Sequence, residues 1–149
     1  MLVILSISDS DKHFASAVAE YTKRLGKQLF FETLKPFKNS NKNLVINKET
    51  EQILMTIEKK YSSFQKFLLI KEGSLRSTAE LHQKIRHQDC VFIIGGPYGV
   101  QREHLKQRFP EMKELSFGAI TMPHGLAKVV LVEQLYRCWT LETGKSYHY

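Results

Sequence analysis

The feature that most constrains the fold of this 149-residue sequence is the alternation of short apolar runs with longer segments of helical periodicity. Strands are predicted at Leu2–Ser8, Gln28–Lys35, Phe67–Ile70, Val91–Ile94 and Leu115–Thr121. Strands that alternate with helices form a parallel sheet covered on both faces. The sequence therefore predicts a single α/β domain over residues 1–149, with a five- to six-stranded parallel sheet and helices on both faces.

Apolar spacing and capping residues predict the helices. The first is expected at 14–25, the second at 46–61 and the fourth at 100–109. Ser77 and Glu80 have capping-box spacing and predict the start of the third helix. The last helix, at about 123–142, is apolar on nearly every side, so it is either central or buried in a partner.

The charge is basic, with a formal net value of +7. The excess of Lys and Arg favours an anionic partner such as nucleic acid, although a solvated basic surface explains it as well. No basic tail is present, so an anion-binding surface must be assembled by folding. The polar segment 38–43 is predicted as a loop, as the most mobile region, and as a place where phosphates are met.

The two cysteines, Cys90 and Cys138, lack the spacing of a metal site or a disulfide framework and are predicted as core residues, with no metal cofactor. The first apolar run is too short to span a bilayer, and no basic region precedes it. The expected location is the cytoplasm, with no membrane partner.

Three glycines follow the fourth predicted strand, in the turn Gly95–Gly99. Glycine has no Cβ, so such a turn lets backbone amides approach a nucleoside closely, although many tight turns of this kind bind nothing. The turn after the first strand, Ser8–Lys12, has no glycine, which disfavours a dinucleotide fold. Gly144-Lys145-Ser146 is not a P-loop, because Trp139 stands where that motif needs glycine.

A second glycine-bearing segment runs from Leu115 to His124. Gly118 and Ala119 permit close backbone approach, and the apolar side chains that follow suit adenine or a thioether. A plain connection from a strand to a helix is the alternative. His124 is either a helix-start residue or a chemical group, and Arg137 either pairs with Glu133 or meets a substrate.

Three motifs occur in order: Ile93–Gly99, Leu115–His124, and Val132–Trp139 followed by Tyr147-His148. Together they closely resemble the ribosomal RNA large subunit methyltransferase H family, the smallest type of SPOUT methyltransferase. The resemblance covers the whole length in element order, and its specific motifs lie between Val91 and His148.

The resemblance implies an α/β knot, in which the C-terminal part forms a deep trefoil knot, an exception to the rule that chains do not thread loops. It also implies a homodimer that binds S-adenosylmethionine in the knot. Such a dimer methylates N3 of a pseudouridine in helix 69 of 23S rRNA within the ribosome. The apolar last helix would then have a partner surface.

The resemblance also implies the site residues. The expected cofactor contacts are Ile70 or Lys71, Gly95, Gly96, Gly118, Ala119, Ile120, Thr121, Met122 and Pro123. The expected substrate contacts are His124, Arg137, Tyr147 and His148, with the tail of one subunit serving the pocket of the other. Arg137, Tyr147 and His148 are the catalytic candidates.

Methyl transfer to an imide nitrogen needs positioning and loss of the N–H proton rather than a covalent nucleophile. Histidine titrates near neutrality, so His148 is the candidate base and Arg137 the candidate stabiliser of the anion. Two positions depart from the family pattern: Tyr98 replaces a frequent acidic residue, and Tyr149 replaces a basic one. The second departure keeps open a catalytically silent, knotted RNA-binding dimer.

Overall fold

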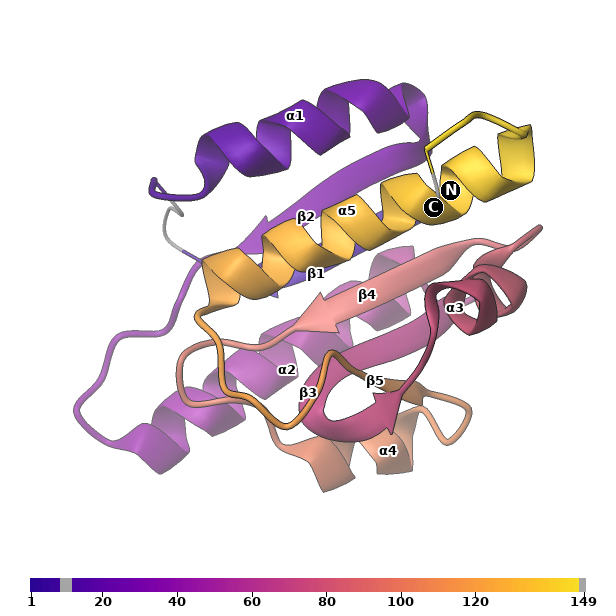
Figure 1. Cartoon of the computed structure of the whole chain (residues 1–149). Coiled ribbons are helices and arrows are strands. Elements are labelled where there is room, and N and C mark those ends of the chain that lie inside the picture. Colours follow the sequence, from indigo (N-terminus) through magenta and orange to yellow (C-terminus); the bar gives the residue numbers. More distant parts are fainter. Residues whose placement is uncertain (9–11, 148–149) are drawn as a thin grey trace.

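The architecture is seen in a computed structural model, which describes residues 1–8 and 12–147 (Figure 1). The strands are β1 (Leu2–Ile7), β2 (Leu29–Leu34), β3 (Gln65–Leu75), β4 (Cys90–Ile94) and β5 (Lys113–Ser116). The helices are α1 (Ala15–Leu25), α2 (Lys42–Lys60), α3 (Thr78–Ile85), α4 (Arg102–Arg108) and α5 (His124–Thr143), with a 3-10 turn η1 (Gly26–Gln28). No helix in these described parts is long and apolar enough to cross a membrane.

The strands form one sheet in the order β2-β1-β4-β3-β5, and every neighbouring pair is parallel. All residues of β4 are buried, as is β1 beyond Leu2. Strands that are buried on both faces are typical of a parallel sheet with helices on each side. The predicted α/β fold class is therefore confirmed, with five strands among the described residues.

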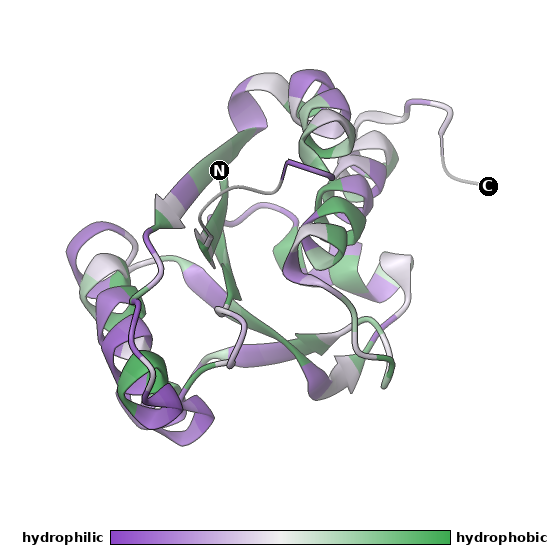
Figure 2. Cartoon of the chain, turned by 90° about the vertical axis from the view of Figure 1, so that its left-hand side faces the viewer, coloured by the Kyte–Doolittle hydropathy of each residue, from purple (hydrophilic) through white to green (hydrophobic). Residues whose placement is uncertain are grey.

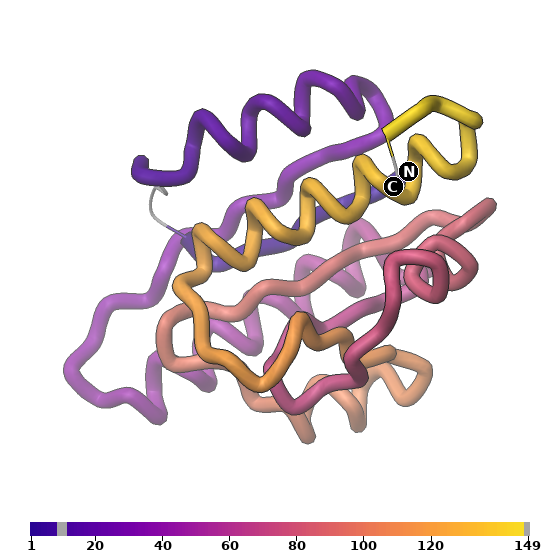
Figure 3. The backbone as a smooth tube through the Cα atoms, viewed as in Figure 1, coloured from indigo at the N-terminus to yellow at the C-terminus, as the bar shows by residue number. Residues whose placement is uncertain are grey.

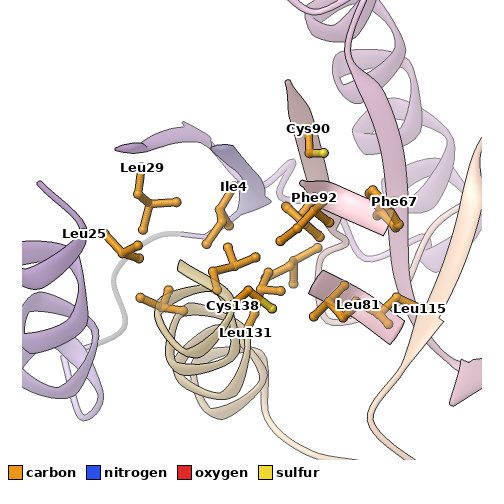
Figure 4. Packing of buried hydrophobic residues seen from close by; sticks show 14 residues of the cluster. Ile4, Leu25, Leu29, Phe67, Leu81, Cys90, Phe92, Leu115, Leu131 and Cys138 are labelled. Atoms are coloured by element: carbon orange, nitrogen blue, oxygen red, sulfur yellow. The ribbon is translucent and has the colours of Figure 1, made fainter. Parts of the chain in front are cut away.

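Alternate residues of the strands belong to two separate hydrophobic cores, one on each face of the sheet. Val3 and Leu5 belong to a cluster with residues of α2 and α4, whereas Ile4 belongs to a cluster with residues of α1, α3 and α5. Figure 2 shows the helices on opposite sides of the sheet, and Figure 4 shows the second cluster, in which Leu131 and Cys138 of α5 face Ile4 and Phe92. Successive side chains of a strand point to opposite faces of the sheet, so each of these strands contributes to both cores.

The last helix is central, which is one of the two alternatives that its sequence left open. Leu131, Val132 and Leu135 are fully buried, and α5 packs between α1 and α3 on the sheet. Both cysteines are buried and free, and burial raises the pKa of Cys90 and of Cys138 to about 12. Their predicted place in the core is confirmed.

Several predicted boundaries differ from the structure, and three of the differences affect the loops. The fifth strand ends at Ser116 rather than Thr121, because Gly118 has a φ of +116° that takes the chain out of the sheet. The third strand continues past Ile70 to Leu75, with a register shift against β5. The polar segment is a shorter loop than predicted, since the Asn41 side chain accepts a hydrogen bond from Leu44 N (3.2 Å) and starts α2.

The connection from β5 to α5 runs close to the second half of β3 and to the chain that follows β4 (Figure 3). The Ser116 hydroxyl lies 2.9 Å from the carbonyl oxygen of Lys71, so the start of this connection is tied to the end of the regular part of β3. This arrangement is consistent with the knotted connection that the family resemblance implies.

Phe92 of β4 lies in the core between the sheet and α5. Its ring is fully buried and stacks on Phe67, with 5.0 Å between ring centroids. Phe92→Ala should lower the free energy of unfolding by roughly 3–5 kcal/mol in urea titrations, because a large cavity is left in a packed core. Met55→Ala, at a side chain that is 66% exposed, serves as the control and should change little. A loss below about 1 kcal/mol for Phe92→Ala would contradict this account.

Candidate functional site

A cavity of about 480 Å³ opens at the carboxyl ends of β3 and β4. Its walls come from three chain segments: residues within 69–72, 94–100 and 117–127. In α/β sheets this edge is where ligands bind, since the loops that follow the parallel strands converge there. The two glycine-bearing turns of the sequence therefore meet in one cavity.

The first of these turns is fixed by its own backbone and by a side chain of α2. Gly99 N donates a hydrogen bond to the carbonyl oxygen of Gly96 (2.9 Å). A Cβ added at Gly96 would lie 2.5 Å from Oε2 of Glu49, so no other residue fits without displacing this carboxyl group. The need for glycine at this position comes from the residue underneath it.

Glu49 itself is 2% exposed. Its Oε2 atom has no hydrogen-bond partner among the described residues, and burial raises the pKa of Glu49 above its usual value. Burial disfavours the charged form of a carboxyl group. A buried acid with a raised pKa thus lies directly beneath the turn that lines the cavity, and no motif of the sequence marks it.

The second turn is held by Ser116, which is 3% exposed. Its hydroxyl oxygen accepts a hydrogen bond from Gly118 N (3.0 Å) and also contacts Lys71. The serine therefore joins the loop after β5 to the irregular part of β3, and both segments are walls of the cavity. A serine two residues before a glycine at the end of a strand is a recognisable turn signal that could have identified it.

Most of the residues predicted to contact a cofactor lie in the cavity wall. They are Ile70, Lys71, Gly95, Gly96, Gly118, Ile120, Thr121 and Met122. Ala119 and Pro123 lie in the same loop but do not line the cavity. His124 lines it, and its Nδ1 atom is buried without a hydrogen-bond partner in the described part of the chain.

Other wall residues had no predicted role. Among them, Glu72 lies in β3, Phe117 follows β5, and Tyr98 projects from the glycine turn. Tyr98 is 48% exposed, a large value for an aromatic side chain. Nothing in the periodicity of the sequence indicates which residues of a loop face a cavity.

Arg137 and Tyr147 are placed elsewhere. Arg137 pairs with Glu133 (2.6 Å), as one of the two predicted alternatives had it, and its guanidinium lies over the ring of Tyr147, 4.8 Å from the centroid. Tyr147 also donates a hydrogen bond to Glu133 (3.2 Å). At a helical rise of ~1.5 Å per residue, Arg137 lies about 20 Å along α5 from His124.

These contacts raise both pKa values and so leave both groups in their usual ionisation states at pH 7. The hydrogen bond to Glu133 raises the pKa of Arg137, and a hydrogen bond with Tyr21 together with burial raises the pKa of Tyr147 above its usual value. Arg137 is a cation and Tyr147 a neutral phenol at pH 7.

His148 and Tyr149 lie outside the described residues. Within the ranges 1–8 and 12–147, no group of three or more His, Cys, Asp or Glu residues is placed to hold a metal ion.

Comparison with known proteins identifies the family to which the chain belongs. The family described as "Predicted SPOUT methyltransferase" matches residues 1–148. The ribosomal RNA large subunit methyltransferase H of Limosilactobacillus reuteri (strain DSM 20016) is 36% identical over 153 residues, which cover 93% of this chain and 92% of that protein. The chain belongs to the ribosomal RNA large subunit methyltransferase H family.

Another member of the methyltransferase H family, from Mycoplasmopsis synoviae (strain 53), is 31% identical over 148 residues, covering 97% of this chain and 96% of that protein. Among solved structures, a Bacillus anthracis protein assigned as an RNA methyltransferase aligns over 100% of both chains with a TM-score of 0.56 and 12% identity. This structure supports the fold alone. The family resemblance predicted from the three motifs is confirmed.

The contact between Gly96 and Glu49 predicts an energetic coupling. Gly96→Ala should destabilise the protein by about 1–3 kcal/mol, because the new Cβ overlaps the buried carboxyl group. In a Glu49→Ala background the same substitution should cost clearly less, since the obstacle has been removed. Urea titrations of the wild type, both single variants and the double variant measure this coupling. Equal costs of Gly96→Ala in the two backgrounds would contradict the contact.

Proposed function

We propose that this protein is an S-adenosylmethionine-dependent methyltransferase that modifies N3 of pseudouridine-1915 in helix 69 of 23S rRNA, in the assembled ribosome and hence in the cytoplasm. The observation that carries the proposal is the convergence of both glycine-bearing turns on one cavity in a chain of the methyltransferase H family. The cavity volume of about 480 Å³ lies in the range of small-molecule sites.

The residues of the cavity fit the cofactor. Gly118 lines the cavity, and an added Cβ there would meet no atom within 4 Å, so its backbone borders open space. Ile120 and Met122 supply apolar wall for an adenine ring or a thioether. When bound, S-adenosylmethionine supplies an electrophilic methyl group. No metal is needed for this chemistry, because the acceptor only has to lose a proton and approach in line.

The chain's polar residues would act on the RNA base. The N3–H proton of the base passes to the imidazole of His148, and the positive charge of Arg137 favours the resulting anion. His124, which lines the cavity, orients the base, and Tyr147 positions Arg137 through the contact between its ring and the guanidinium. The N3 atom of the RNA base would then bond to the methyl carbon as the bond between that carbon and the sulfur breaks, which leaves S-adenosylhomocysteine.

We also propose that the protein works as a homodimer with composite sites. Arg137 and Tyr147 lie near the far end of α5 from the cavity of their own chain, about 20 Å away along the helix. A second copy packed against α5 could bring its own Arg137 and tail to this cavity. The separation within one chain is the reason for proposing the dimer.

The activity is tested directly with ribosomes. Purified protein should transfer one labelled methyl group from S-adenosylmethionine to 70S ribosomes from a strain that lacks this methyltransferase. Mass spectrometry of 23S rRNA fragments should place the methyl group on the pseudouridine of helix 69. Ribosome binding without methyl transfer would instead support the catalytically silent RNA-binding dimer. No heat on titration with millimolar S-adenosylhomocysteine would contradict cofactor binding.

The composite site predicts complementation between two inactive variants. Met122→Trp should block the cavity and abolish S-adenosylhomocysteine binding, whereas Arg137→Ala should slow methyl transfer and leave that binding intact. Mixing the two variants under conditions that exchange subunits should partly restore methylation, because one mixed site has an open cavity and an intact Arg137. A mixture no more active than the two variants measured separately would argue against a site shared between chains.

A further inference from the structure

The turn between Gly96 and Gly99 carries an aromatic side chain that has no role in the proposed function. Tyr98 lines the cavity, yet 48% of its surface is exposed. The hydrogen bond from Gly99 N to Gly96 O (2.9 Å) holds the backbone on both sides of it. A half-exposed ring on a fixed turn at a cavity remains available to a ligand larger than the cavity.

The ring of Tyr98 has a cationic neighbour from a distant part of the chain. Nζ of Lys42, the first residue of α2, lies 5.2 Å from the centroid of the Tyr98 ring. Lys42 is exposed, and the first turn of α2 contains no acidic residue to offset its charge. It also belongs to the polar segment 38–43, in which the sequence analysis expected contact with phosphates.

Together the two side chains have the chemistry of a single-stranded RNA contact. Unstacked bases of RNA bind by stacking on aromatic side chains, while lysines contact the phosphates. We propose that Tyr98 stacks on a base next to the methylated nucleotide and that Lys42 contacts a neighbouring phosphate. The methylated base enters the cavity, and the adjacent nucleotide lies on its exposed edge.

This inference rests on the proposed function, since it names how the same site holds its RNA. A base stacked on Tyr98 would help to keep the target loop unstacked and to fix its register relative to the cavity. Stacking on a flat ring tolerates any base, because every base has a π-face. The pair therefore contributes affinity and positioning, and the choice of nucleotide is left to the shape of the ribosomal site.

The test measures binding of the protein to 70S ribosomes in the presence of S-adenosylhomocysteine, so that it does not depend on methyl transfer. Tyr98→Ala should weaken ribosome binding about tenfold, whereas Tyr98→Phe, which keeps the ring, should bind nearly as the wild type does. S-adenosylhomocysteine affinity of both variants, measured by calorimetry, should stay within about twofold of the wild type. Phe30→Ala removes an aromatic side chain of similar exposure (49%). It lies on β2, the edge strand at the other side of the sheet from β5, and its removal should have no effect on ribosome binding.

Lys42 is tested by the salt dependence of the same binding. Lys42→Gln should weaken binding and lower the slope of log affinity against log salt concentration by roughly 0.7–0.9, the loss of one phosphate contact. Lys59→Gln, at the other end of α2, is the matched control and should leave the slope unchanged.

The other outcomes separate failure of this proposal from failure of the proposed function. If Tyr98→Ala leaves ribosome affinity within about twofold, the ring does not stack on RNA. If it weakens S-adenosylhomocysteine binding instead, the ring belongs to the cofactor. Wild-type protein that binds ribosomes but does not methylate them would overturn the proposed function alone, because the binding comparison still decides the role of Tyr98. Wild-type protein that binds no ribosomes would overturn both.

Discussion

The rest of the structure depends on the burial of β1 and β4 on both faces. Both strands are nearly continuous apolar runs, so each must be covered by helices from two sides, and only crossover connections can supply them. All neighbouring strands are consequently parallel, and the chain leaves every strand at the same edge of the sheet. The cavity lies at this edge because of that constraint.

Two polar side chains turn the converging loops into one site. Ser116 joins the loop after β5 to Lys71, and Glu49 fills the space below Gly96. Neither side chain needs to contact a ligand for this role. A buried carboxyl oxygen without a hydrogen-bond partner among the described residues is costly, and here Oε2 of Glu49 lies where a side chain at Gly96 would have to go.

The long α5 helix separates two halves of the proposed chemistry. Its first residue, His124, lines the cavity, while Arg137 is held by Glu133 and Tyr147 near the other end. The proposed pairing with a second copy would close this separation, and the proposed activity would then depend on assembly. The exposed Tyr98 and Lys42 then provide a surface beside the same cavity for RNA too large to enter it.

The sequence by itself determined the fold class, the capping box of Ser77 and Glu80, and the two turns whose glycines line the cavity. These features are local. Periodicity indicates which faces of an element are buried, and glycine indicates where the backbone has no space for a Cβ or adopts a positive φ. Only the tertiary structure decided the strand order, the early end of β5 at Ser116, and the contact of Lys42 with the Tyr98 ring. Such contacts join residues far apart in the chain, and they depend on how whole elements pack rather than on any local pattern.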